Sequence, residues 1–263
     1  MTESFDGLHN FRDTGGTALI GGGATREGVL YRSDALSALT PTGVDQFSAS
    51  PIGVVVDFRT PQERHSAPDR LPDDRPVEVV ELSILEGAMA EMAQRILASG
   101  APLTADDADE IAASLPTLDA LYIGMLQHGG AAFAEVARFV SRSADDAPTA
   151  VLVHCTAGKD RTGVATALLL DAVGAERAAV VEDYSASQAN LAGEWADGML
   201  QMISSFGIPL TPELQTLVTG SPAEAMEKTL GWIDTTYDGS AAYLRVGGLS
   251  EAELLALRER LRA

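Results

Sequence analysis

Short apolar runs mark the expected strands of this chain. The runs at 52–58 and 150–153 are largely apolar, and the first contains three consecutive valines. Such runs predict strands buried on both faces, as in a parallel sheet. Further strands are predicted at 29–33 and 77–84. Because helical patterns alternate with them, these strands predict an α/β fold, with a central, mostly parallel sheet of about four to five strands flanked by helices.

Apolar residues at helical spacing, with start and stop signals, predict the helices. Residues 40–43 resemble a helix start, and residues 250–253 form a capping box. The Asn/Asp/Gly-rich piece at 10–16 is expected to be a loop in which Arg12 and Asp13 pair with each other. The predicted helices cover residues 87–99, 118–141, 164–173, 177–188, 194–206, 213–218 and 223–237.

The run at 150–153 leads directly into the part of the chain that carries candidate chemistry. The only cysteine, Cys155, follows this strand, and Arg161 stands at the start of the next helix. A loop that runs from a strand into a helix N-terminus points several backbone N–H groups into one concavity. An arginine adds a planar fork of donors that matches two phosphate oxygens. The same positive field favours a thiolate, so Cys155 is predicted to be a nucleophile aimed at a bound phosphorus.

The string from His154 to Gly163, His-Cys-Thr-Ala-Gly-Lys-Asp-Arg-Thr-Gly, resembles the signature of the cysteine-dependent protein tyrosine phosphatase superfamily. It is similar to the atypical bacterial branch, which removes phosphate from tyrosine, often from serine or threonine, and often from phosphoinositides. The resemblance spans nearly the whole chain and is strongest at 10–64, 149–174 and 229–255. It implies one phosphatase domain over residues 1–263, with residues 86–118 as an inserted helical lid.

The resemblance and the chemistry together assign roles to the loop residues. Cys155 is expected to attack phosphorus and form a phosphocysteine. Thr162, by resemblance, is expected to donate a hydrogen bond to the cysteine sulfur. His154 is expected to order the loop by hydrogen bonds; a general-base role is the weaker alternative, because a pre-formed thiolate needs no base. Backbone amides and Arg161 are expected to hold the phosphoryl oxygens. The expected phosphate-binding residues are Thr156, Ala157, Gly158, Lys159, Asp160 and Arg161.

The proton donor to the leaving group has two candidates. Asp160 lies within the loop, where the thiolate and the bound dianion favour its protonated form, and the resemblance also points to it. Glu86 is the rival, because it follows the 77–84 strand and would face the same crevice. Lys159 has two open roles: contact with a second phosphate, as in phosphoinositide phosphatases, or neutralisation of Asp160.

A second polar group follows the strand at 52–58. Asp57 and Arg59 stand at its carboxyl end, where open α/β sheets bind ligands, so they are expected to support the site or contact substrate. Glu63 and Arg64 are expected to be a solvated pair at a helix start.

Composition limits the partners of the protein. Its 38 acidic and 18 basic residues give a formal net charge of −20, which argues against nucleic acid or an anionic membrane as a partner. A single cysteine excludes an intramolecular disulfide and favours a reducing compartment. The N-terminus lacks a signal-peptide pattern and no membrane anchor is expected, so a cytoplasmic location is predicted, although relatives are sometimes exported without a cleavable signal. No metal or cofactor is expected, because no cluster has ligand spacing.

The leading hypothesis is a phosphomonoester hydrolase acting on a phosphorylated protein or a phosphoinositide. An inositol-polyphosphate phosphatase is the alternative of the same class. A rhodanese-like sulfurtransferase also uses a loop cysteine, but the Gly-Lys-Asp-Arg-Thr-Gly ending argues against it. A non-enzymatic phosphate-binding module is disfavoured by the intact cysteine, arginine and threonine. The sequence does not indicate an oligomeric state.

Overall fold

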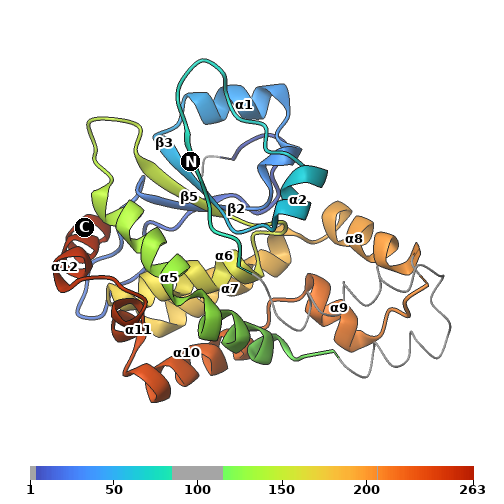
Figure 1. Ribbon diagram of the computed structural model, residues 1–263. Coiled ribbons are helices and arrows are strands. Elements are labelled where there is room, and N and C mark those ends of the chain that lie inside the picture. The colour runs from blue at the N-terminus through green and yellow to red at the C-terminus, as the bar shows by residue number, and fades with distance from the viewer. Residues whose placement is uncertain (1–3, 85–114, 206) are drawn as a thin grey trace.

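The computed structural model describes residues 4–84, 115–205 and 207–263. Within these ranges a five-stranded sheet has the order β1-β2-β5-β3-β4 (Figure 1). Strands β2, β5, β3 and β4 run parallel, and β1 pairs antiparallel with β2 at one edge. The predicted α/β class and mostly parallel sheet are confirmed. The strands are β1 (Arg12–Asp13), β2 (Leu30–Ser33), β3 (Ile52–Asp57), β4 (Glu78–Glu81) and β5 (Ala150–His154).

The central strands β3 and β5 are buried along their whole length, as their apolar runs predicted. Side chains alternate between the two faces of the sheet. Val151 and Val153 of β5 join one core cluster, while Ala150 and Leu152 join the other. Full burial of each such aliphatic side chain contributes about 1.5–3 kcal/mol, so the centre of the sheet is the firmest support available to the loop that follows β5.

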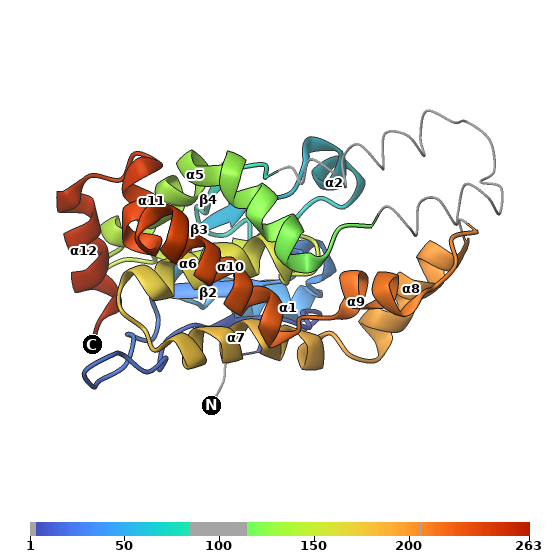
Figure 2. The ribbon, with the colours of Figure 1, turned by 90° about the horizontal axis from the view of Figure 1, so that it is seen from below.

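Helices cover both faces of the sheet. The smaller layer contains α1 (Pro41–Ser48) and α2 (Pro61–Ser66), and the larger layer is built on α5 (Leu118–Arg142), α6 (Asp160–Ala172) and α7 (Arg177–Asn190). Figure 2 shows α6 between α5 and α7. The remaining helices are η1 (Leu36–Ala38), α8 (Glu194–Ser205), α9 (Pro212–Thr219), α10 (Ala223–Tyr237), α11 (Ser240–Val246) and α12 (Glu251–Leu261).

Local signals start several of these helices at their observed residues. Thr40 caps α1 by accepting a hydrogen bond from the Gly43 amide. Ser250 and Glu253 form the predicted capping box of α12. A second capping box, between Thr60 and Glu63, starts α2. It fixes Glu63 in the first turn of α2, near the phosphate-loop residues described below.

Two local expectations differ from the structure. The 10–16 segment contains the short strand β1, because its backbone can pair with the free edge of β2. Arg12 forms an ion pair with Asp183 of α7, at 2.8 Å. Asp13 instead accepts hydrogen bonds from the backbone amides of Gly15 and Gly28. Neighbouring side chains of a strand point to opposite faces, which separates Arg12 from Asp13. The predicted helix at 87–99, most of the 86–118 segment and Glu86 lie outside the described residues.

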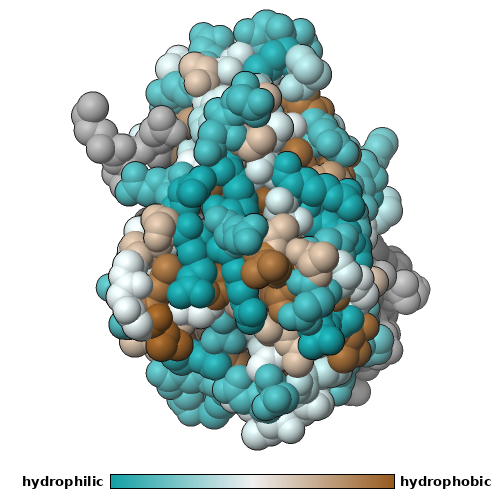
Figure 3. Space-filling view, turned by 90° about the vertical axis from the view of Figure 1, so that its left-hand side faces the viewer, coloured by the Kyte–Doolittle hydropathy of each residue, from teal (hydrophilic) through white to brown (hydrophobic). Residues whose placement is uncertain are grey.

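The face in Figure 3 is largely hydrophilic, with hydrophobic residues in small scattered groups. Among the described helices, none combines the length and the apolar character needed to cross a membrane.

Candidate active site

The loop between β5 and α6 forms the floor of the candidate site. Cys155 follows the last residue of β5 and is 2% exposed, and α6 begins five residues later at Asp160. Lys159 caps α6 with its backbone in the right-handed region. The nucleophile candidate is therefore held between a buried central strand and the N-terminal end of a thirteen-residue helix.

The carbonyl groups of this loop point away from its interior. Thr156 O accepts a hydrogen bond from the Ala35 amide at 3.0 Å. The Asn10 side chain donates to Ala157 O and Gly158 O, at 3.0 and 3.1 Å. Because the C=O of a planar trans peptide points opposite to the next N–H, the amides of residues 157–159 face into the loop. The loop is therefore a cradle of donors for an anion.

A buried cationic group supports the outer side of the cradle. Arg32 donates to Gly158 O at 2.8 Å and pairs with Asp183 at 2.5 Å. Burial alone would raise the pKa of Asp183, but the charges of Arg32 and Arg12 hold it below its usual value. Asp183 thus remains an anion that fixes both arginines behind the loop.

Gly158 allows the loop to pass close to β2. Its φ is +65°, and a Cβ atom there would lie 2.2 Å from Ser33 O. A residue with a side chain would be strained by the backbone conformation and would also collide with this carbonyl. Gly158 was expected among the phosphate-binding residues, and its backbone conformation and its contact with Ser33 explain why a glycine stands there.

Arg161 is fixed by a residue that the sequence did not assign to the site. Its guanidinium donates to both carboxylate oxygens of Glu63, at 2.8 and 2.7 Å, and Thr156 donates to the same carboxylate at 2.6 Å. Burial would raise the pKa of Glu63, yet Arg161 and Thr156 hold it well below its usual range. The expectation that Glu63 is a solvated member of a surface pair is wrong. Arg64 does pair at the surface, with Glu81.

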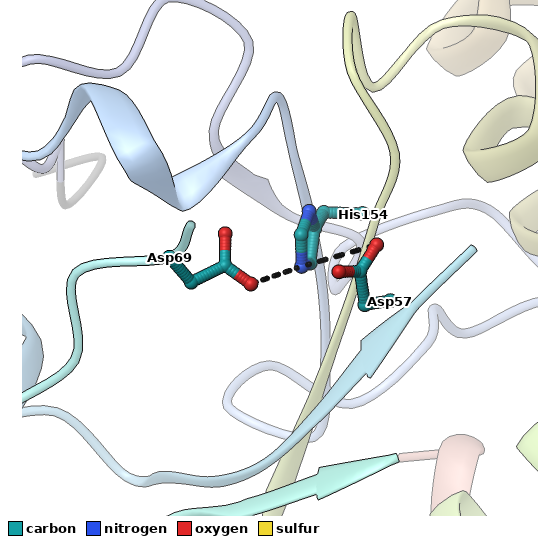
Figure 4. Close-up of side chains that lie close together, drawn as sticks. All are labelled: Asp57, Asp69 and His154. Carbon is teal, nitrogen blue, oxygen red and sulfur yellow. Dashed lines mark ion pairs between the residues drawn. The ribbon is translucent and has the colours of Figure 1, made fainter. Parts of the chain in front are cut away.

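His154 sits among charged groups behind the cysteine. Its Nδ1 is 3.2 Å from Cys155 O, and its Nε2 is 3.3 Å from Asp69 Oδ2 and 3.9 Å from Asp57 Oδ1 (Figure 4). The two carboxylates lie near the ring, although Nε2 forms no hydrogen bond among the described residues. The contact with Cys155 O bears on the ordering role expected for His154, which stays a prediction.

The same three side chains are the one group in the described chain with ligand atoms close enough for a metal, all within 4.8 Å of one another. Arg59 already contacts both carboxylates, at 2.8 Å from Asp57 and 2.9 Å from Asp69. The guanidinium therefore supplies the positive charge that a metal ion would bring. Asp57 and Arg59 are both buried.

The candidate acid Asp160 lies on the wall of the pocket, with 21% of its side chain exposed. Tyr122 of α5 donates a 2.6 Å hydrogen bond to its Oδ1, and Lys159 Nζ lies 3.1 Å from the same oxygen. Lys159 is fully buried and also donates to the carbonyls of Leu217 and Gly220. Its ammonium group therefore does not lie at the rim of the loop.

A cavity of about 250 Å³ opens above Cys155. It brings together the loop and side chains from α5, α8 and α9. A second cavity of about 340 Å³ adjoins it, sharing Thr156 and Trp195. The first cavity is lined by Leu121, Cys155, Thr156, Ala157, Asp160, Arg161, Trp195, Met199, Leu217 and Val218.

The structure brings most of the predicted site residues together. Thr162 is fully buried, but its hydroxyl has no hydrogen-bond partner among the described residues, so the expected bond to the cysteine sulfur is not formed here. Sequence reasoning missed Glu63, Asp69, Tyr122 and Tyr184. Of these, only Glu63 carried a signal, because its Thr-Pro-Gln-Glu capping box placed it in a helix start just beyond β3.

Known proteins resemble this chain in sequence or in structure. Triple specificity protein phosphatase PtpB of Mycobacterium tuberculosis is 32% identical over 270 residues, covering 96% of each chain. A tyrosine-protein phosphatase of Nostoc commune is 30% identical over 236 residues, covering 88% of this chain and 74% of that one. The solved structure of P. aeruginosa TpbA is similar at 17% identity and a TM-score of 0.35, covering 72% of this chain and 86% of that one. The model of the tyrosine phosphatase family matches residues 3–263, and the chain therefore belongs to that family.

Proposed function

We propose that this enzyme hydrolyses phosphomonoesters through a phosphocysteine intermediate on Cys155. The thiolate sulfur attacks phosphorus, and the bond from phosphorus to the leaving oxygen breaks. Asp160 gives its proton to that oxygen. In the second step Asp160 takes a proton from water, the water oxygen attacks phosphorus, and the sulfur–phosphorus bond breaks to release inorganic phosphate.

The observation that carries this proposal is the donor cradle around Cys155. The carbonyls of residues 156–158 are all bound on the outside of the loop, which turns the following amides inward. The N-terminus of α6 adds positive potential at the same place, and Arg161 lines the cavity above Cys155. Such pre-oriented donors stabilise the charge of a phosphoryl group during transfer, because they need no rearrangement when the charge develops.

The acid role of Asp160 is supported by its place on the pocket wall beside Cys155. An acid matters most when the leaving group is poor, since a good one departs as an anion, and a positioned acid contributes about 10²–10⁴-fold. Asp160→Asn should therefore slow hydrolysis of tyrosyl and alkyl phosphates strongly and spare an activated aryl phosphate. Glu86→Gln should do little by comparison. If Glu86→Gln shows the leaving-group dependence, and Asp160→Asn loses equally on both kinds of substrate, the general acid is Glu86.

Phosphotyrosine is the proposed substrate class, with phosphoserine and phosphothreonine as secondary substrates. The pocket walls include Trp195, Met199 and Leu121, which offer apolar surface to an aromatic ring. The relative named as a triple specificity phosphatase supports a range wider than phosphotyrosine alone. Phosphoinositides and inositol polyphosphates are less favoured, because the three contacts of Lys159 hold its ammonium inside the protein.

A turnover panel tests the substrate class directly. Phosphotyrosyl, phosphoseryl and phosphothreonyl peptides would be compared with mono- and polyphosphorylated inositol lipids and soluble inositol polyphosphates. Fastest turnover of the phosphotyrosyl peptides is expected. Preference for a polyphosphorylated inositol would contradict the proposed substrate class without affecting the covalent mechanism. A thiosulfate assay checks the sulfurtransferase alternative, for which no turnover is expected.

A further inference from the structure

The carboxyl group of Asp160 is held on one oxygen only. Oδ1 accepts the 2.6 Å hydrogen bond from Tyr122 and lies 3.1 Å from Lys159 Nζ. In the described part of the chain, no hydrogen bond reaches Oδ2. The two oxygens of the candidate acid are therefore unequal: one is anchored to the protein interior, and the other is left for the pocket that Asp160 lines.

The anchor is itself oriented by a second tyrosine. Tyr122 OH and Tyr184 OH are 2.7 Å apart, and their rings meet edge to face with centroids 5.9 Å apart. A hydroxyl has one proton to donate. Since Tyr122 donates its proton to Asp160, Tyr184 must be the donor to Tyr122. The direction of both hydrogen bonds is thus fixed, from α7 through α5 to the start of α6.

Both tyrosines are rigid donors. Each is fully buried, and the Tyr184 ring lies against Gly163, where a Cβ atom would be 3.0 Å from the ring. Burial, followed by the negative charge of Asp160, raises the pKa of Tyr122 well above its usual value. The pKa of Tyr184 is raised for the same two reasons. Both hydroxyls therefore keep their protons at any pH at which a phosphatase would be assayed.

We propose that Tyr122, oriented by Tyr184, is a positioning residue that anchors Asp160 Oδ1 so that Oδ2 delivers the proton to the leaving group. This inference rests on the proposed role of Asp160 as the general acid. The donor also stabilises the carboxylate that remains after the proton has left.

Tyr122→Phe is the direct test, because it removes the hydroxyl and keeps the ring. Without this donor the Asp160 carboxylate is harder to form. The alkaline limb of the pH–rate profile should therefore move to higher pH, by about one pH unit. Turnover of a tyrosyl or alkyl phosphate should fall about tenfold, as part of the 10²–10⁴-fold that a positioned acid supplies. An activated aryl phosphate should be nearly unaffected. Tyr184→Phe should show a smaller change in the same direction.

Tyr243→Phe is the matched control. Tyr243 is also buried, and its hydroxyl donates a 2.6 Å hydrogen bond to the Leu126 carbonyl, away from Asp160. It reports what the loss of a buried tyrosine hydroxyl does to folding, measured as the denaturant midpoint of each variant. The control should leave the alkaline limb and the leaving-group dependence unchanged.

The outcomes separate this inference from the proposal on which it rests. If Tyr122→Phe behaves like Tyr243→Phe while Asp160→Asn shows leaving-group dependence, Asp160 is the acid and the positioning role is refuted. If Asp160→Asn shows no such dependence, the acid assignment fails and the positioning role fails with it. An equal loss on both substrates in Tyr122→Phe, with an unmoved alkaline limb, would also refute the inference, because it indicates general damage to the fold.

Discussion

The carboxylate of Glu63 is predicted to keep Arg161 ready for the phosphoryl group. It accepts four hydrogen bonds: two from Arg161, one from Thr156 and one from the Thr60 amide, all between 2.6 and 2.8 Å. In Glu63→Gln one oxygen becomes an NH₂ group, which itself donates. With the NH₂ group in place of Oε2, the contacts with Arg161 and the Thr60 amide both become donor against donor. With the NH₂ group in place of Oε1, only the Arg161 contact does, because the Thr156 hydroxyl can turn and accept.

The expected size of the effect follows from these contacts. A hydrogen bond to a charged group contributes about 1.5–3 kcal/mol. Because 31% of the Glu63 side chain is exposed, solvent screening reduces the contribution of each hydrogen bond. Glu63→Gln should therefore lower the free energy of unfolding by about 2 kcal/mol in total. An arginine freed from its partner has about 2 kcal/mol of rotamer entropy to lose again. Removal of the negative charge strengthens the pull of Arg161 on phosphate and offsets part of this entropy cost, so the net fall in kcat/KM should be about tenfold.

Denaturant unfolding and steady-state kinetics on one phosphotyrosyl peptide measure the two effects. Glu81→Gln is the control, because Glu81 pairs with Arg64 at 2.9 Å but has 58% of its side chain exposed. The pKa of Glu63 is depressed in the folded state, so its stabilisation is present above the unfolded value of about 4.3 and is lost as pH falls below it. The difference in free energy of unfolding between wild type and Glu63→Gln should therefore shrink as the pH falls below about 4.3. Kinetics within twofold of wild type would refute the role of Glu63.

Two further substitutions test the loop. Lys159→Met should lower the free energy of unfolding, because the ammonium group is bound to carbonyls of the protein. It should slow phosphotyrosine and phosphoinositide turnover by the same factor. Lys228→Met, at the surface, is the control. A selectively larger phosphoinositide loss would show that Lys159 reaches a second phosphate. Gly158→Ala should abolish activity, because Gly158 has a positive φ and also lies against the Ser33 carbonyl. Gly174 has a positive φ but no such neighbour, so Gly174→Ala should lower the free energy of unfolding by only about 1–2 kcal/mol. Similar effects of the two substitutions, measured by unfolding and turnover, would count against the close contact.

Periodicity and local signals predicted most of the framework, because these depend on neighbouring residues. The 150–153 run became β5, and the helix predicted at 223–237 begins and ends at the observed residues of α10. The position of Cys155 between a strand and a helix followed from the same reasoning. The order β1-β2-β5-β3-β4 needed the structure, since it depends on packing between segments far apart in the sequence.

The direction of individual side chains could not be predicted. Lys159 was a candidate for the loop rim, yet it points inward to carbonyls of Leu217 and Gly220, some sixty residues away. Arg12 was expected to pair with its neighbour, but its partner Asp183 is 171 residues distant. Such contacts depend on which helices pack together. The pattern of apolar positions determines that packing only approximately, so Tyr122 and Tyr184 left no signal of their own.

Trapping of the covalent intermediate tests the central claim most directly. The wild-type enzyme would be mixed with a phosphotyrosyl peptide, stopped within the first turnover by a denaturing quench, digested and examined by mass spectrometry. The account predicts a phosphoryl group on the peptide that contains Cys155, formed no more slowly than turnover and absent from Cys155→Ser, which should bind inorganic phosphate but not turn over. Turnover by Cys155→Ser, or an intermediate on a residue other than Cys155, would contradict the account.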